Sequence, residues 1–208
     1  MKSLILAAGL ATSAMPAVAE TYDIRLAGST VGSLTATPTA LTSQLNNTPM
    51  GAADGWFKAT SDGTTYAAEN SGGRKIRTVI EGGRVTSTTV TPNSEATDLS
   101  EPSAVPAGVL DPVRGFAQVM RAGDCPDAFR MYDGRRAIEV TPKSRSREGN
   151  LLICQMDYRV IAGPGHVSPF RLKNLTMETR YTIDGDRVTG MALMRLKAGP
   201  FTVTLAAR

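Results

Sequence analysis

A helix, a cysteine and a charged turn follow one another in residues 110–136, LDPVRGFAQVMRAGDCPDAFRMYDGRR. Asp111 is a favourable N-cap residue, and Pro112 fits the first helical position, where no N–H is needed. Apolar residues at spacings of three and four form one side of this segment: Val113, Phe116, Ala117 and Met120. These features predict a short helix over about 111–122, ended by Gly123 in the left-handed conformation.

The chain on both sides of this helix alternates between apolar and polar residues. In residues 151–160, LLICQMDYRV, every second residue is apolar, and the same period recurs in residues 22–26, 175–183 and 201–205. A period of two is typical of antiparallel strands that bury one face. Gly82-Gly83 marks a tight hairpin turn between two further strands. The predicted fold is therefore mainly β: a curved antiparallel meander or half-open barrel of roughly ten strands, with the helix packed on it.

Two cysteines, Cys125 and Cys154, are present in the whole chain. An even number of cysteines favours a disulfide if the protein is exported to an oxidising compartment. Closing a loop of about 30 residues would stabilise the fold by roughly 3–4 kcal/mol. We expect this bridge to link the end of the helix to the inward side of the strand at 151–160.

The N-terminal residues 1–20, MKSLILAAGLATSAMPAVAE, have the pattern of an export signal. Lys2 provides a positive start, an apolar run follows, and residues 17–19 form a small-x-small cleavage site. The apolar run is shorter than a membrane-spanning helix. We therefore expect cleavage after Ala19, one β-rich domain over 20–208, and a location in the periplasm.

Charge is unevenly distributed along the chain. Residues 20–110 contain 6 Lys and Arg against 9 Asp and Glu, whereas residues 111–208 contain 16 against 10. The basic second half is either an ordinary solvated surface or a face that contacts anionic lipid head groups or polysaccharide. Nucleic acid is not an expected partner, because aromatic residues make up only 5% of the chain and are too sparse to stack bases.

Residues 91–108, TPNSEATDLSEPSAVPAG, show no apolar periodicity and are rich in Ser, Thr, Pro and acidic residues. This composition predicts a long exposed loop. Such a loop is either a passive connector or a segment with a function of its own, such as docking a partner.

The turn at Asp133-Gly134 places two arginines where they could bind a ligand. A two-residue turn would direct Arg135 and Arg136 to opposite faces of the sheet, one of them toward the concave interior. A guanidinium there is suited to two-point binding of a carboxylate or phosphate head group. The alternative is that Arg136 pairs with Asp111 or another acid and braces the helix.

Apolar residues at inward positions are the other candidates for contact with a ligand. The candidate lining residues are Phe116, Met120, Met156 and Tyr158. Methionine surfaces adapt to varied apolar ligands, but methionine also fills irregular cores, and the sequence leaves both interpretations open.

His166 is the single histidine, in a loop rich in proline and glycine, and we expect it to be a surface residue. One histidine cannot form a His-based metal cluster, and the G-x-S-x-G motif of serine hydrolases is absent. No catalytic, cofactor-binding or metal-binding residue is predicted.

The segments LDPVRGFAQVM, YDGRR and NLLICQMDYRVIAG, together with Cys125, resemble the bacterial exported proteins grouped as domain-of-unknown-function family 3108. That family combines a D-P helix, a cysteine, an aromatic-D-G-R-R turn and a second cysteine before a tyrosine. The resemblance implies a curved antiparallel sheet, similar to the half-open barrels of periplasmic lipoprotein carriers, and an exported location. It implies no reaction.

The function expected from these features is that of a non-catalytic binding or carrier module for an apolar or amphipathic envelope component such as a lipid. We expect a periplasmic monomer that uses no cofactor and contacts an anionic membrane or envelope surface peripherally. One alternative is an envelope assembly or scaffolding protein that docks a partner through residues 91–108 and its basic face. A second alternative is a hydrolase that uses His166.

Overall fold

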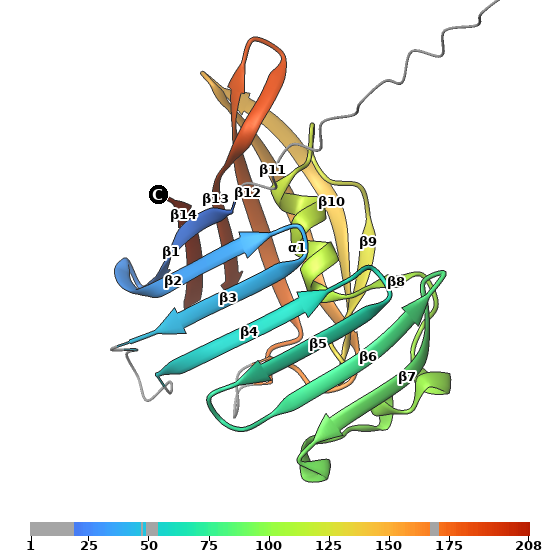
Figure 1. Cartoon of the computed structure of the whole chain (residues 1–208). Coiled ribbons are helices and arrows are strands. Elements are labelled where there is room, and N and C mark those ends of the chain that lie inside the picture. Colours follow the sequence, from blue (N-terminus) through green and yellow to red (C-terminus); the bar gives the residue numbers. More distant parts are fainter. Residues whose placement is uncertain (1–18, 47, 49–53, 167–170) are drawn as a thin grey trace, which may run out of the picture.

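The computed structural model describes residues 19–46, 48, 54–166 and 171–208. Fourteen strands form one sheet that curls into a nearly closed barrel around a single α-helix (Figure 1). The predicted fold class is confirmed, although the strands number fourteen rather than about ten. The predicted export signal lies outside the described residues, apart from Ala19, which directly precedes the first strand.

The elements have the following bounds in chain order: β1 Glu20–Leu26, β2 Ser29–Thr37, β3 Ala40–Leu45, β4 Gly55–Ser61, β5 Thr65–Asn70, β6 Lys75–Glu81, β7 Arg84–Thr91, η1 Asn93–Glu95, η2 Asp98–Ser100, η3 Pro102–Ala104, β8 Val109–Leu110, α1 Pro112–Met120, β9 Phe129–Tyr132, β10 Ala137–Glu148, β11 Leu151–Ala162, β12 Asn174–Asp184, β13 Arg187–Ala198 and β14 Phe201–Ala207.

Two meanders make up the sheet, with the order β7-β6-β5-β4-β3-β2-β1 followed by β14-β13-β12-β11-β10-β9-β8. They are joined where the first and last strands pair antiparallel, with Ile24 opposite Leu205. Neighbouring strands are antiparallel except β8 and β9, which are parallel. The Gly82-Gly83 turn between β6 and β7 has positive φ at both residues, 55° and 75°, as the sequence predicts.

The segment 91–108 is largely exposed, as predicted, but it contains regular structure that the sequence did not indicate. Three short 3-10 helices occupy this segment, and Leu99 is buried against the second, smaller apolar cluster of the core. The Tyr132 hydroxyl donates to the Leu99 carbonyl oxygen at 2.5 Å, and the Thr97 hydroxyl donates to the Arg135 carbonyl oxygen at 2.9 Å. Hydrogen bonds from Gly108 and Val109 to the Gly83 carbonyl oxygen complete the link between β7 and β8.

Helix α1 lies inside the curve of the sheet, between β2–β6 at the front and β10–β13 behind them (Figure 1). Its N-cap is Asp111, as predicted, and the buried carboxylate accepts from the Arg114 N–H at 3.0 Å and the Ser61 hydroxyl at 2.8 Å. The helix ends at Met120 with Arg121 as C-cap, and Gly123 does not have the positive φ that we expected.

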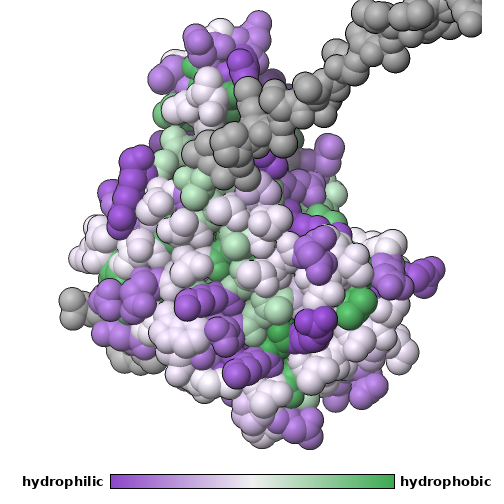
Figure 2. All heavy atoms as spheres, viewed as in Figure 1, coloured by the Kyte–Doolittle hydropathy of each residue, from purple (hydrophilic) through white to green (hydrophobic). Residues whose placement is uncertain are grey.

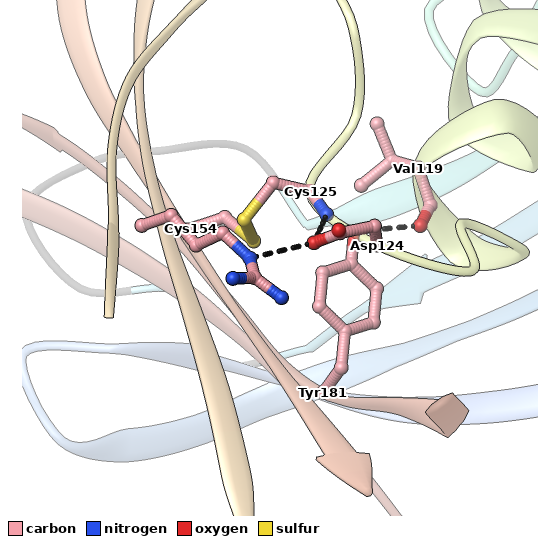
Figure 3. The surroundings of a disulfide bond; sticks show 6 residues. Val119, Asp124, Cys125, Cys154 and Tyr181 are labelled. Carbon is pink, nitrogen blue, oxygen red and sulfur yellow. Dashed lines mark hydrogen bonds and ion pairs between the residues drawn. A yellow bond between two sulfur atoms is a disulfide. The ribbon is translucent and has the colours of Figure 1, made fainter. Parts of the chain in front are cut away.

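The predicted disulfide between Cys125 and Cys154 is present, with the two Cα atoms 5.5 Å apart (Figure 3). It links the segment after α1 to the inner face of β11, where Cys154 is fully buried. Close by, the Tyr181 hydroxyl donates to the Val119 carbonyl oxygen at 2.8 Å, which satisfies a backbone group in the last turn of the helix. The C-terminal end of the helix is thus held to the sheet by one covalent bond and one buried hydrogen bond, and the Ser61–Asp111 hydrogen bond holds the N-terminal end.

The apolar residues of the alternating strands meet on the inner face of the sheet. The core around α1 includes five methionines: Met120, Met156, Met177, Met191 and Met194. On the outer face seen in Figure 2, apolar residues occur in small groups among hydrophilic and near-neutral ones. This distribution is expected for a sheet that buries one face.

Candidate functional site

The side chains of the inner face leave two cavities, and Pro112, the first residue of α1, lines one of them. The first, which we call the apolar cavity, has a volume of about 220 Å³. Its walls are Leu172, Leu175, Leu196, Ala198, Phe201 and Val203, with Tyr158 and His166 at one side. The strand register aligns four of these residues in pairs, since Leu175 is opposite Tyr158 and Leu196 is opposite Val203. The apolar cavity therefore follows directly from the alternation of β11–β14.

The second cavity, which we call the polar cavity, has a volume of about 240 Å³. Its apolar walls are Phe57, Tyr66, Ala68, Ile76, Pro112, Met131 and Ile138, and its polar walls are Glu69, Asn70, Arg74, Asp133, Arg135, Arg136, Tyr158 and His166. Tyr158 and His166 thus belong to the walls of both cavities. These two residues form the boundary between an apolar and a polar space.

The prediction that His166 is a surface residue is wrong, because its ring is partly buried and both nitrogens have partners. Nδ1 lies 2.9 Å from Nη1 of Arg136, and Nε2 lies 2.8 Å from the hydroxyl oxygen of Tyr158. The backbone of His166 forms an isolated antiparallel bridge with Leu172. Burial, and then the positive charge of Arg136, lower the pKa of His166 to about 4, although Asp133 opposes this shift. The imidazole is therefore neutral at neutral pH.

The partners of His166 determine which ring nitrogen carries the proton. An arginine side chain only donates hydrogen bonds, so the His166 Nδ1 atom accepts from Arg136. In the neutral ring the proton then lies on Nε2, and this N–H donates to the Tyr158 hydroxyl oxygen. Burial raises the pKa of Tyr158, so the hydroxyl keeps its own proton. That proton remains available for another acceptor.

The turn that carries Arg136 differs from the predicted two-residue turn. Tyr132 pairs with Ala137, so residues 133–136 form a four-residue turn. The Asp133 Oδ1 atom accepts from the backbone N–H groups of Arg135 and Arg136, both at 2.9 Å. The Asp133 side chain therefore stabilises the turn by accepting hydrogen bonds from its backbone, which is a common role for aspartate in turns.

The two arginines contact different parts of the molecule. Arg136 forms an ion pair with Asp133, with 3.0 Å between Nε and Oδ2, and also contacts His166. Arg135 forms an ion pair with Glu95 of η1, with 3.1 Å between Nη2 and Oε2, and holds that helix against the turn. Arg136 is therefore braced by a nearby acid, but this acid is not Asp111.

The other candidate residues are not brought together with Arg136. Asp111 binds Arg114 and Ser61 at the start of α1. Phe116 makes an edge contact with Tyr22, with 6.1 Å between the ring centroids. Phe116, Met120 and Met156 belong to the packed core around the helix rather than to the walls of the two cavities, and of the four candidate lining residues Tyr158 alone lines them.

The sequence did not indicate Tyr66 as a site residue, and it indicated His166 only in the hydrolase alternative. Tyr66 lies at an inward position of β5, opposite Ser61 and Thr78, and is only 2% exposed. An inward-facing tyrosine in an alternating strand can indicate a site residue from the sequence alone, because its hydroxyl needs a hydrogen-bond partner when it is buried. No comparable signal marks His166, since its partners come from residues 8 and 30 positions away in the chain.

In the part of the chain that the structure describes, no group of three or more His, Cys, Asp or Glu residues is arranged to hold a metal ion. Within the same part, no helix is long and apolar enough to cross a membrane. No family model matches the chain, and neither a curated protein nor a solved structure matches it. The resemblance to domain-of-unknown-function family 3108 therefore stays a prediction.

Proposed function

We propose that this protein is an exported binding or carrier module for an amphipathic molecule, whose apolar part occupies the apolar cavity. The observation that carries this proposal is a space with apolar walls that ends at a polar pair, Tyr158 and His166. Ligand sites typically combine mostly apolar walls with a few placed polar groups. An apolar cavity with one polar side matches a molecule that has an alkyl chain and a polar head.

The size of the apolar cavity restricts the ligand. Pockets for drug-sized ligands usually measure roughly 300–1,000 Å³, and the apolar cavity has about 220 Å³. This space suits one short alkyl chain rather than a complete two-chain lipid. A single-chain amphiphile is therefore the proposed ligand class.

The disulfide supports the exported location, because such bonds persist in oxidising compartments such as the periplasm. The same bond holds α1 in one part of the interior, so the helix cannot move freely into the remaining space. A fixed cavity lowers the entropy lost on binding.

The proposal is tested with a cavity-filling variant. Val203 faces the apolar cavity, whereas Thr204, the next residue of β14, faces outward. We expect Val203→Trp to abolish fluorescence enhancement of the apolar probe N-phenylnaphthylamine, and Thr204→Trp to retain it. Native mass spectrometry of protein taken from its own periplasm should show a co-purifying single-chain amphiphile. Equal probe binding by both variants, with native melting curves, would contradict the proposal.

A further inference from the structure

The polar groups around the two cavities leave unfilled hydrogen-bonding capacity on donors, namely two tyrosine hydroxyl groups and the Nε–H group of Arg136. The Tyr158 hydroxyl accepts from His166, and its own proton has no acceptor among the described residues. The Tyr66 hydroxyl also makes no hydrogen bond with any residue that the structure describes, although it lies in the wall of the polar cavity. Neither hydroxyl is among the fully buried atoms without a partner, so both remain open to a molecule in the cavity, and a ligand that supplies an acceptor gains a hydrogen bond from each.

The acceptors in the same region are already occupied. The Nδ1 atom of His166 accepts a hydrogen bond from Nη1 of Arg136. The Gly165 carbonyl oxygen accepts another from the same Nη1 atom, at 3.3 Å. The Asp133 Oδ1 atom accepts hydrogen bonds from the backbone N–H groups of Arg135 and Arg136, and Oδ2 forms the ion pair with the Arg136 guanidinium. The Asn70 side-chain oxygen accepts from the backbone of Arg74. A ligand that donates hydrogen bonds would therefore find few free partners here.

Glu69 is the remaining carboxylate in the wall of the polar cavity. It pairs across the sheet with Lys58 and Lys75, and all three line a groove on the outer face. Its neighbour Ala68 is the inward, buried residue of this part of β5. The Glu69 carboxylate therefore lies beside two lysines of the outer groove, although Glu69 also contributes to the wall of the polar cavity.

The charges around the polar cavity also favour an anion. Three guanidinium groups line it, those of Arg74, Arg135 and Arg136. Two carboxylates form ion pairs with these arginines. The Glu95 Oε2 atom lies 2.9 Å from Nη2 of Arg74 and 3.1 Å from Nη2 of Arg135. The Asp133 carboxylate pairs with Arg136. One positive charge is left without a counter-charge.

We propose that the head group of the bound amphiphile is an oxyanion, a carboxylate or a phosphate monoester, which accepts hydrogen bonds from Tyr158 and Tyr66. Both tyrosines line the same cavity of about 240 Å³, a space small enough for one head group to contact the two side chains. Tyr158 also lines the apolar cavity, so the chain attached to that head group can enter it beside the ring. This inference rests on the proposed function and adds the chemical class of the ligand.

The test compares three ligands with the same alkyl chain by isothermal titration calorimetry: decanoate, decyl phosphate and decanol. We expect at least one of the two anions to bind the wild-type protein tenfold or more tightly than decanol. Tyr158→Phe and Tyr66→Phe should each reduce the affinity for that anion about tenfold while leaving the affinity for decanol near the wild-type value, because a hydrogen bond to a charged group is worth about that factor.

Tyr132→Phe is the matched control, because the Tyr132 hydroxyl is also buried but already donates to Leu99. It should leave the preference for the anion unchanged. Equal affinities of the wild type for the anions and decanol would overturn the head-group assignment and leave the carrier function standing. Failure of all three ligands to bind would overturn both proposals. If one Tyr→Phe variant fails to fold, as judged by its melting curve, the other still decides the result.

Discussion

The His166 Nε2 atom lies 2.8 Å from the Tyr158 hydroxyl oxygen, and this contact joins a loop to the inner face of β11. On the other side of the ring, Arg136 brings the β9–β10 turn to the same point. Three segments therefore meet at one neutral imidazole. The geometry explains why the only histidine of the chain lies in the interior wall rather than on the surface.

The first prediction concerns pH. His166 has a pKa lowered to about 4 in the folded protein, against the ordinary histidine value of 6.5, so the unfolded chain binds a proton first as the pH falls. The contribution of His166 to stability is complete above about pH 6.5 and is lost progressively as the pH falls toward 4. Urea unfolding between these pH values should show this decline.

The matched control is His166→Gln, which has no titrating group at this position. Its unfolding free energy should be flat between pH 6.5 and about 5, even if it is lower overall. The carboxylates with lowered pKa values, among them Asp62 and Glu178, lose their contributions below about pH 5 in both proteins alike, so the difference between the two proteins isolates His166. An identical decline in both proteins would mean that His166 is not the cause.

The second prediction concerns the disulfide. Cys125→Ser should lower the free energy of unfolding by about 3–4 kcal/mol under oxidising conditions, because the loop that the bridge closes is no longer constrained in the unfolded chain. Reduction of the wild type should have a similar effect in denaturant titration. Reductant should not affect the variant, and any further loss in its presence would contradict this explanation.

The third prediction concerns the start of α1. Asp111→Ala should destabilise the protein by about 2–4 kcal/mol, because it removes a helix cap and leaves buried donors of Ser61 and Arg114 without an acceptor. Asp98→Ala removes a carboxylate from an exposed position of η2 and should change stability by less than about 0.5 kcal/mol. Thermal unfolding of both variants distinguishes a specific role of Asp111 from a general effect of charge.

The fourth prediction concerns the segment between β7 and β8. Tyr132→Phe removes the hydrogen bond to the Leu99 carbonyl oxygen and should cost about 1 kcal/mol. Amide hydrogen exchange should become faster in residues 92–108 but not in β11–β13, because local opening follows local contacts. Uniformly faster exchange along the chain would instead indicate a global loss of stability.

Local patterns in the sequence determined the class of fold. Alternation along segments such as 151–160 depends only on the two-residue repeat of a strand, and the Asp-Pro start of the helix depends on its first turn. The pairing of Cys125 with Cys154 followed because these are the two cysteines of the chain. The same reasoning recognised Arg136 and Tyr158 as candidates, since both lie next to or within an inward-facing strand.

Only the tertiary structure decided how these parts meet. The pairing of β1 with β14 joins residues about 180 positions apart, as in Ile24 and Leu205, and no local pattern encodes such a contact. The ordering of residues 91–108 depends on hydroxyl-to-carbonyl bonds with the distant β9–β10 turn. The partners of His166 and the unfilled space beside it depend on the register of several strands at once. A sequence specifies which residues face inward, but only the closed sheet determines which of them touch.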